Sequence, residues 1–403
     1  MSKAAADAGI VTPVKGPGLI GRVVAGQSLP GLAARLGASI GRVLGKPLRI
    51  GRRVIAVRHA HVTDLLRRDG EFGIAPINKD KIEAVNGGPF VLGMDRSEVL
   101  ERERRALYAA LAATDFTMLK TELQSGVAAR LRASAPGAPL DVVSDYARPL
   151  ATRTAQLLFG VSGPDDDFFM EVARSIFGHT FLNIGNDAAI RDRAIKAGAF
   201  MQQWLTEEIA RRRAAGELKA DMMGMLLRQE ILDDDGVRRT LGGMLVGSID
   251  TTTSCVAKIV KVASGDPALY AAMVRDRNDL QRLNGWCNEA LRRWPHNPIV
   301  LRQGLCDADL GGCAVRAGDT VLAWTQAAML DPAIFPEPER LRPDREPASY
   351  LHLGGGVHPC AGRAVNRFQI PMLVAGLLDR GFGRVGAVGW AGPFPNRLIA
   401  TLN

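Results

Sequence analysis

The chain has 403 residues, of which 47% are hydrophobic and 23% charged, and its formal net charge is +9 at pH 7. This composition is ordinary for a globular enzyme that buries a large core. The basic residues are spread along the chain and only 5% of residues are aromatic, so the composition does not favour nucleic-acid binding. The five cysteines are an odd number, which argues against a disulfide framework.

The chain contains no uninterrupted apolar run of roughly 18 residues, the length that a membrane-spanning helix requires. Its first residues show no clear signal-peptide cleavage pattern. We therefore expect a cytoplasmic protein without a membrane span. No linker or internal repeat divides the sequence, so we expect an N-terminal extension at residues 1–45 followed by one domain at residues 46–403.

In chain order, the pattern first predicts two short strands at 47–51 and 53–58, then a helix at 59–70 and a long irregular loop at 74–90. Helices are then predicted at 96–113, 119–133, 142–158, 165–177, 188–215, 221–231, 237–262, 267–275 and 279–294.

Beyond Pro295 the pattern predicts short strands at 300–302, 313–316 and 320–323, a Pro-rich segment at 332–347 and a last helix at 361–380. Strands do not alternate with helices as in a parallel α/β protein. The expected fold is therefore mainly α with small β-sheets, in the α+β class.

The most informative segment starts at Leu353 and reads Leu-Gly-Gly-Gly-Val-His-Pro-Cys-Ala-Gly. Its glycines allow unusual backbone angles and the close approach of a flat ligand, and Pro359 stiffens the chain before the next helix. Cys360 stands where this loop meets that helix, whose free N–H groups and partial positive charge favour a thiolate with a lowered pKa. The pattern indicates a sulfur ligand for a metal, although a lone cysteine at such a place is usually part of a core.

The segment resembles the haem loop of the cytochrome P-450 family, Phe-Gly-x-Gly-x-His-x-Cys-x-Gly. The matching positions are Gly354, Gly356, His358, Cys360 and Gly362. Leu353 stands where the family usually has Phe. The resemblance implies a single-domain cytochrome P-450 fold with a long central helix over the haem. It also implies that haem b (iron protoporphyrin IX) is held through the Cys360 thiolate, with Leu353, Gly354 and Gly362 beside it.

Two further motifs fit the resemblance. Glu289 and Arg292 share a helix face, and by resemblance they form a structural triad with Arg340 of the Pro-rich segment. Alone, such a pair is usually a solvated surface pair.

The second motif is Gly247-Ser-Ile-Asp-Thr-Thr252 within the predicted helix at 237–262, where poor helix formers predict a bend. The resemblance assigns proton delivery to Asp250 and Thr251. The alternative is an ordinary Thr-rich packing feature.

The two haem propionates require cationic partners. By resemblance these are His358, Arg302 and Arg104. The family often has His four residues before that last arginine, and Leu100 stands there instead. Arginine-rich helix faces are more often merely solvated.

The resemblance implies a monooxygenase that uses O2 and a hydrophobic small molecule. No nicotinamide-binding pattern is present, so electrons are expected from a ferredoxin-type donor with its reductase, guided to Arg363 and Arg367. Two alternatives stay open: a peroxygenase or isomerase that needs no reductase, and a non-catalytic haem sensor or electron carrier. Apolar residues predicted to line the substrate pocket are Phe90, Val91, Phe177, Phe181, Leu245, Ile299 and Val300.

Overall fold

We analysed a computed structural model, which describes residues 3–11, 32–183, 185–391 and 394–403. Residues 12–31 of the predicted N-terminal extension lie outside the described residues. The helices are α1 (Lys3–Asp7), α3 (Leu32–Leu44), α4 (His59–Arg67), α5 (Ala75–Asn86), α6 (Glu98–Ala113), α7 (Thr117–Arg132), α8 (Arg148–Phe159), α9 (Asp166–Phe177), α10 (Ala188–Ala215), α11 (Met222–Gln229), α12 (Asp234–Val246), α13 (Asp250–Ser264), α14 (Pro267–Asp276), α15 (Leu280–Arg293), α16 (Thr325–Ala328) and α17 (Arg363–Arg380). The strands are β1 (Leu48–Ile50), β2 (Arg53–Ala56), β3 (Phe72–Gly73), β4 (Pro139–Asp141), β5 (Val300–Gly304), β6 (Ala308–Leu310), β7 (Cys313–Val315), β8 (Thr320–Ala323), β9 (Phe382–Val385), β10 (Gly389–Ala391), β11 (Phe394–Arg397) and β12 (Ile399–Leu402).

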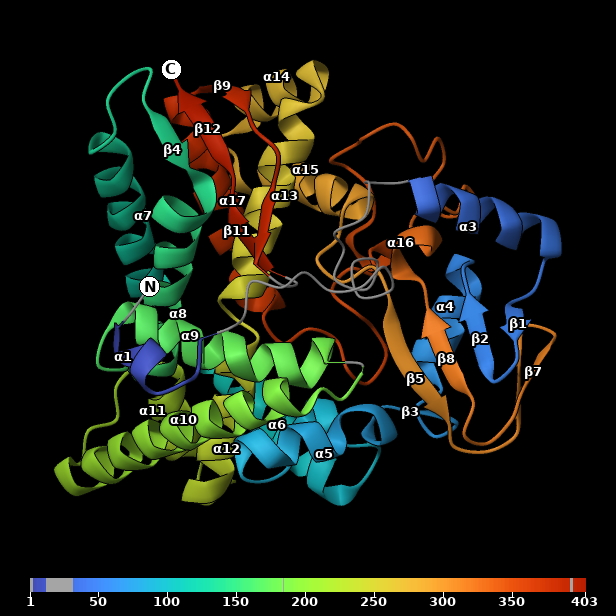
Figure 1. The fold of residues 1–403 in the computed structure, drawn as a ribbon, viewed down its shortest axis with the longest axis horizontal. Helices are drawn as coiled ribbons and strands as arrows, with labels where there is room; N and C mark the ends of the chain where they lie inside the picture. Colours follow the sequence, from blue (N-terminus) through green and yellow to red (C-terminus); the bar gives the residue numbers. More distant parts are fainter. Residues whose placement is uncertain (1–2, 12–31, 184, 392–393) are drawn as a thin grey trace.

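A five-stranded sheet in the order β1-β2-β8-β5-β3 forms one end of the molecule, together with α3 and α4 (Figure 1). β1 and β2 form a hairpin, as the sequence predicts. β2 then pairs in parallel with β8, so Arg53 lies opposite Thr320. This pairing joins the beginning of the described domain to the segment that precedes the cysteine loop.

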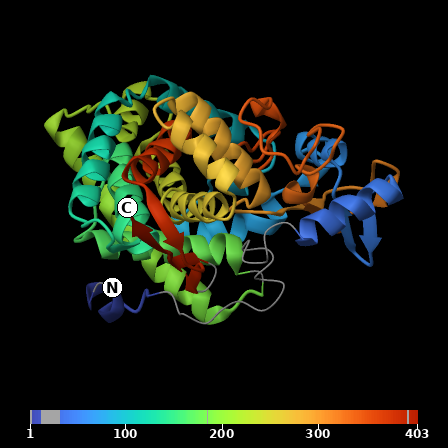
Figure 2. The same ribbon diagram turned by 90° about the horizontal axis from the view of Figure 1, so that it is seen from above.

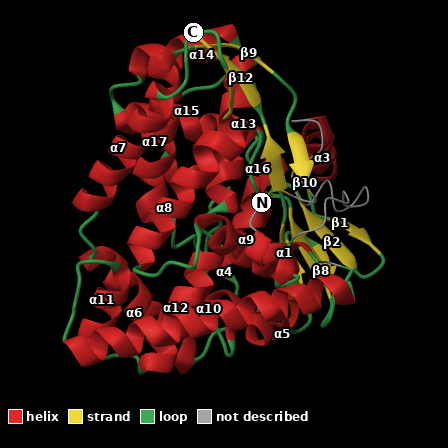
Figure 3. Ribbon diagram, turned by 60° about the vertical axis from the view of Figure 1, so that its left-hand side comes forward, coloured by secondary structure: helices red, strands yellow, loops and turns green. Residues whose placement is uncertain are grey.

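The other end of the molecule is helical (Figures 1 and 2). One hydrophobic cluster gathers side chains mainly from α5, α6 and α8–α12, and a second gathers side chains from α7, α13, α15 and α17. The three-stranded sheet β4-β12-β9 closes the second cluster. Helices dominate and the strands lie along one side (Figure 3), so the predicted fold class is confirmed. None of the described helices is long and apolar enough to cross a membrane.

The predicted loop at 74–90 is wrong, because most of it is α5. The Asp95 carboxylate accepts hydrogen bonds from the backbone N–H groups of Ile74 (2.7 Å) and Ala75 (3.0 Å) and so satisfies the start of this helix. Gly87 ends the helix with a left-handed φ of 63°.

The predicted helix at 237–262 is interrupted. α12 ends at Val246 and α13 begins at Asp250, with a turn between them. Hydroxyl groups compete for the carbonyls of this turn: Ser248 Oγ donates to Leu245 O (2.7 Å), and Thr251 Oγ1 donates to Gly247 O (2.5 Å). The bend that the motif predicts is therefore present, and it divides the helix.

Candidate active site

The cysteine loop is held by its own backbone and by α4. The Cys360 N–H donates to Leu353 O at 2.8 Å, which closes the loop on itself. Gly354 and Gly356 both have φ of 67°, a left-handed conformation that favours glycine. A Cβ at Gly356 would overlap the Leu66 carbonyl oxygen. Glycine is therefore required at Gly356 both by backbone angle and by the close approach of α4.

The pKa of the Cys360 thiol is raised, because burial disfavours the thiolate. The N–H groups of Gly362 and Arg363 and the charge of Arg363 act in the opposite direction but do not offset burial. The expectation of a lowered pKa is therefore wrong for the protein chain alone. A thiolate at this place needs a positive charge on its sulfur, which a metal ion supplies.

Three basic side chains lie near this loop. Burial, and then the charge of Arg302, lower the pKa of His358 to about 4, and the charge of Arg104 acts in the same direction. Arg302 is 4% exposed and donates to Leu301 O at 2.8 Å, and burial lowers its pKa to about 10. Arg104 Nε is buried without a hydrogen-bond partner among the described residues. The three residues predicted to bind the propionates thus lie in one region beside the cysteine loop.

Tyr108 is a contact that sequence reasoning missed. Its hydroxyl donates to Pro359 O at 3.2 Å, and the Arg104 guanidinium lies 5.2 Å from the centroid of its ring. Burial raises the pKa of this phenol. Tyr108 lies four residues after Arg104 on α6, so helical spacing is the signal that could have identified it.

Asp250 does not stand free beside Thr251. Its carboxylate accepts two hydrogen bonds from Arg174 of α9, at 2.7 Å from Nη2 and 3.1 Å from Nε. Arg174 also pairs with Glu171 at 3.4 Å, and all three side chains are buried. Burial alone would lower the pKa of Arg174, but Asp250 more than offsets this and raises it. Arg174 thus fixes the orientation of the predicted acid.

Glu289 and Arg292 form the predicted ion pair, with both side chains 0% exposed and Nε 2.7 Å from Oε1. The third predicted member is wrong. The guanidinium that reaches Glu289 belongs to Arg345, at 3.2 Å, and the Tyr350 hydroxyl donates to the same carboxylate at 2.8 Å.

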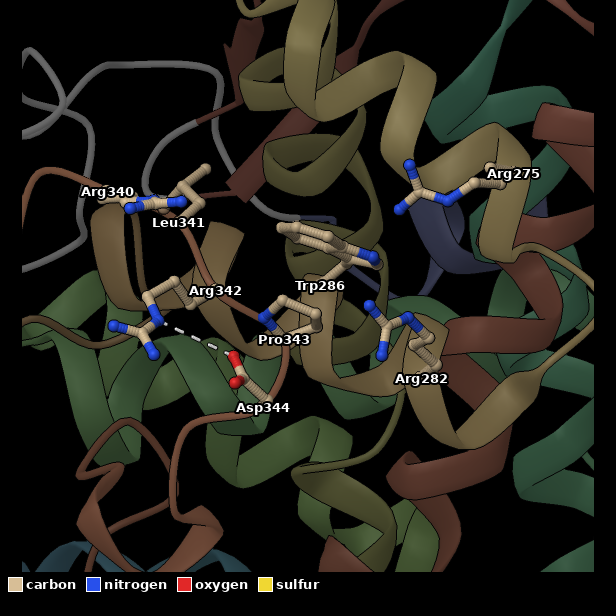
Figure 4. A pocket seen from close by; sticks show the side chains of 8 residues that line it. All are labelled: Arg275, Arg282, Trp286, Arg340, Leu341, Arg342, Pro343 and Asp344. Carbon is tan, nitrogen blue, oxygen red and sulfur yellow. Dashed lines mark ion pairs between the residues drawn. The ribbon is translucent and has the colours of Figure 1, made fainter.

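The Arg340 side chain is 69% exposed and pairs with Glu337, and only its backbone carbonyl accepts from Arg292 and Arg345. It lines a surface pocket of about 390 Å³ between α14, α15 and the Pro-rich segment (Figure 4). The residues that line this pocket are Arg275, Arg282, Trp286, Arg340, Leu341, Arg342, Pro343 and Asp344. The Arg340 side chain therefore lines this surface pocket and makes no contact with the Glu289 carboxylate among the described ion pairs.

Five of the predicted pocket residues share the first hydrophobic cluster: Phe90, Val91, Phe177, Phe181 and Leu245. The rings of Phe177 and Phe181 are 4.9 Å apart, and Phe90 fills the space beside Gly243 of α12. Val300 packs instead against the cluster of the five-stranded sheet, and Ile299 is half-buried beside it.

The comparisons with known proteins agree with this geometry. A family model for cytochrome P-450 matches residues 259–380. The mycinamicin IV hydroxylase/epoxidase of Micromonospora griseorubida is 29% identical over 305 residues, which are 74% of this chain and 73% of that protein. The cytochrome P-450 monooxygenase PikC of Streptomyces venezuelae is 31% identical over 285 residues, 67% of this chain and 65% of that protein.

Among solved structures, CalO2 superposes with a TM-score of 0.79 at 23% identity, over 92% of this chain and 96% of that one. A cytochrome P-450 solved with an acyl carrier protein that carries a fatty acid gives the same TM-score, 0.79, at 19% identity. Both show the same fold. The chain belongs to the cytochrome P-450 family and is an oxidoreductase of the monooxygenase class.

The family implies a haem-thiolate cofactor, and the residues present fit one. Cys360 supplies a half-buried sulfur, and Gly356 allows its loop to lie directly against α4. Arg104 leaves a buried Nε without a partner among the described residues, and buried Arg302 and half-buried His358 lie nearby. Two arginine cations and an imidazole in one region favour an anion, and carboxylates such as the haem propionates are suitable.

Proposed function

We propose that this protein inserts one oxygen atom from O2 into a hydrophobic organic molecule, using haem b held by Cys360. The observation that carries the proposal is the half-buried Cys360 loop, with buried Arg302 and half-buried His358 beside it. When bound, haem supplies the iron that binds and reduces O2, and a thiolate ligand favours cleavage of the O–O bond.

We assign the delivery of protons to Asp250 and Thr251. Thr251 donates to Gly247 O within the turn that separates α12 from α13, so its hydroxyl is fixed at the bend. Arg174 donates two hydrogen bonds to the Asp250 carboxylate and so holds it in one orientation. Asp250 can pass on a proton only after it has taken one up and released Arg174. Arg174 acts through Asp250 and is therefore a positioning residue.

The apolar cluster of Phe90, Phe177, Phe181 and Leu245 favours a hydrophobic substrate. Two relatives are named as a mycinamicin IV hydroxylase/epoxidase and a cyclooctat-9-en-7-ol 5-monooxygenase, and neither substrate is assigned to this chain. Their names support the class of reaction, which is hydroxylation or epoxidation of an apolar skeleton.

Electrons are proposed to come from a ferredoxin-type protein and its reductase. Arg363 and Arg367 at the start of α17 are exposed, and the charge of Arg363 acts on Cys360. Within the part of the chain that the structure describes, no ion pair engages either arginine. With a net charge of +9, the protein attracts an acidic donor electrostatically.

The test is the carbon monoxide difference spectrum of the reduced protein beside a Cys360→Ala control. A strongly red-shifted Soret band that is absent from the control is expected. Haem incorporation without that band would contradict thiolate ligation. Hydrogen peroxide supplied alone, compared with ferredoxin, reductase and NAD(P)H, then separates a peroxygenase from an O2-dependent monooxygenase.

A further inference from the structure

His296 lies between α15 and β5, and it carries a polar group that the protein itself leaves unsatisfied. Both of its ring nitrogens are buried, and neither has a hydrogen-bond partner among the described residues. Unpaired buried donors and acceptors lower stability, so a protein rarely keeps both on one ring unless a ligand or water completes them.

The backbone around His296 is firmly held. Lys258 of α13 donates to the carbonyls of Pro295 (2.7 Å) and His296 (3.5 Å). Thr325 Oγ1 donates to Pro298 O at 2.9 Å, and Gln326 Nε2 donates to Arg293 O at 2.7 Å. Side chains from two other helices thus fix the carbonyls of this segment, while its imidazole has no partner. Rigid support of an unsatisfied polar group is the arrangement of a preorganised binding site.

The imidazole faces the apolar cluster assigned to the substrate. Its ring centroid lies 5.8 Å from that of Phe177, which in turn lies 4.9 Å from Phe181. The charge of Asp250 also acts on His296, so the ring lies near the proposed proton-delivery group. Burial, and then the charge of Lys258, lower the pKa of His296 to about 3. The ring is therefore neutral near pH 7, with one nitrogen donating and one accepting.

We propose that His296 is a specificity-determining residue that hydrogen-bonds a hydroxyl group on an otherwise apolar substrate. A hydroxyl both donates and accepts, so it matches a neutral imidazole. A carboxylate does not fit as well, because Lys258 is engaged by backbone carbonyls and Arg174 by Asp250. This inference rests on the proposed function, since it assigns a substrate contact to the same site.

The test measures binding to the haem-loaded protein by calorimetry. The probes are a terpenoid alcohol, a steroid alcohol and cyclododecanol, each paired with its methyl ether, which accepts but cannot donate. Wild type is expected to bind at least one alcohol about 10-fold more tightly than its ether. In His296→Phe the ratio is expected to fall to about one, and in His296→Asn, which keeps a donor and an acceptor, part of it should remain.

His61→Phe is the matched control, because His61 lies on α4, outside the proposed substrate site, and should keep the wild-type ratio. The ligand-free His296→Phe protein should unfold at the same temperature as wild type or higher, since it loses unsatisfied groups. The proposal is overturned if no alcohol is preferred, if the preference survives in His296→Phe, or if that variant unfolds several degrees lower. Binding is read without turnover, so these outcomes are distinct from a missing carbon monoxide band.

Discussion

At the scale of single residues, the contribution of each buried charged side chain depends on the partner that it contacts. Arg174 pairs with two buried carboxylates at once, so its removal breaks the ion pairs with both Asp250 and Glu171. Arg174→Leu is expected to lower the free energy of unfolding by about 3–5 kcal/mol, measured in urea. Arg191→Leu removes an exposed pair with Asp192 and should change it by less than about 0.5 kcal/mol. Equal effects would show that the Asp250 contact is not a buried ion pair.

Arg345 and Arg340 offer a matched pair within one segment. Arg345→Leu removes a guanidinium that is 7% exposed from Glu289, so we expect a loss of about 3–5 kcal/mol and weaker haem retention. Arg340→Leu removes an exposed side chain and should cost less than about 0.5 kcal/mol. Haem content and urea unfolding of the two variants are the measurements. A larger loss in Arg340→Leu than in Arg345→Leu would restore Arg340 as the third member of the triad with Glu289 and Arg292.

Lys258 makes stability depend on pH. Burial lowers its pKa from 10.5 to about 7, so between these values the unfolded chain binds more protons than the folded one. Stability from this group therefore rises as the pH increases across that window. The free energy of unfolding, measured at several pH values between 7 and 10, should rise more steeply with pH for wild type than for Lys258→Met. Parallel curves would mean that the ammonium is not buried in the folded protein.

Sequence reasoning identified Cys360, Glu289 and Arg292 because fixed spacing carries those signals. It selected Arg340 over Arg345 because both arginines follow prolines in one irregular segment, and nothing local tells which turns inward. It missed Arg174 because the contact with Asp250 joins two helices that are distant in sequence. Residue type and spacing do not record such pairings.

At the scale of elements, the cysteine loop depends on its close contact with α4. Gly356→Ala adds a Cβ that overlaps the Leu66 carbonyl oxygen and also disfavours φ of 67°. We expect loss of bound haem and destabilisation well beyond the backbone cost. Gly312→Ala is the control, since its φ is 80° but nothing lies within 4 Å of the added Cβ, so about 1–2 kcal/mol is expected. Haem titration of both variants is the measurement, and similar haem affinities would contradict a close contact between the loop and α4.

The helices between residues 96 and 294, the last helix α17 and the hairpin β1–β2 were predicted from periodicity and turns, whereas α3 and α16 were missed and α5 was predicted as a loop. Its apolar positions are sparse, and its first N–H groups are satisfied by Asp95, which follows the helix in sequence. The break between α12 and α13 was foreseen as a bend because threonine hydroxyls reach back to carbonyls. When side chains distant in sequence satisfy the terminal N–H groups of a helix, the local sequence pattern does not predict that helix.

At the scale of the whole molecule, the excess of positive charge should govern electron transfer. Arg363→Glu with Arg367→Glu is expected to lower the rate of reduction by an acidic ferredoxin at least about 10-fold at low salt. The difference should shrink as ionic strength rises. Stopped-flow reduction measures it, with Arg153→Glu on α8 as an exposed control. An equal loss in the control would mean that only net charge matters.

The contact between Gly356 and the Leu66 carbonyl also sets an order of assembly. On the ribosome, α4 emerges long before the cysteine loop, and the strand β8 that joins the two regions emerges between them. The surface that receives the loop can therefore form first, while the segment that carries the cysteine sulfur emerges long after it. A nascent chain that stops before this loop would contain the α4 surface that receives the loop but would lack the cysteine that binds the cofactor.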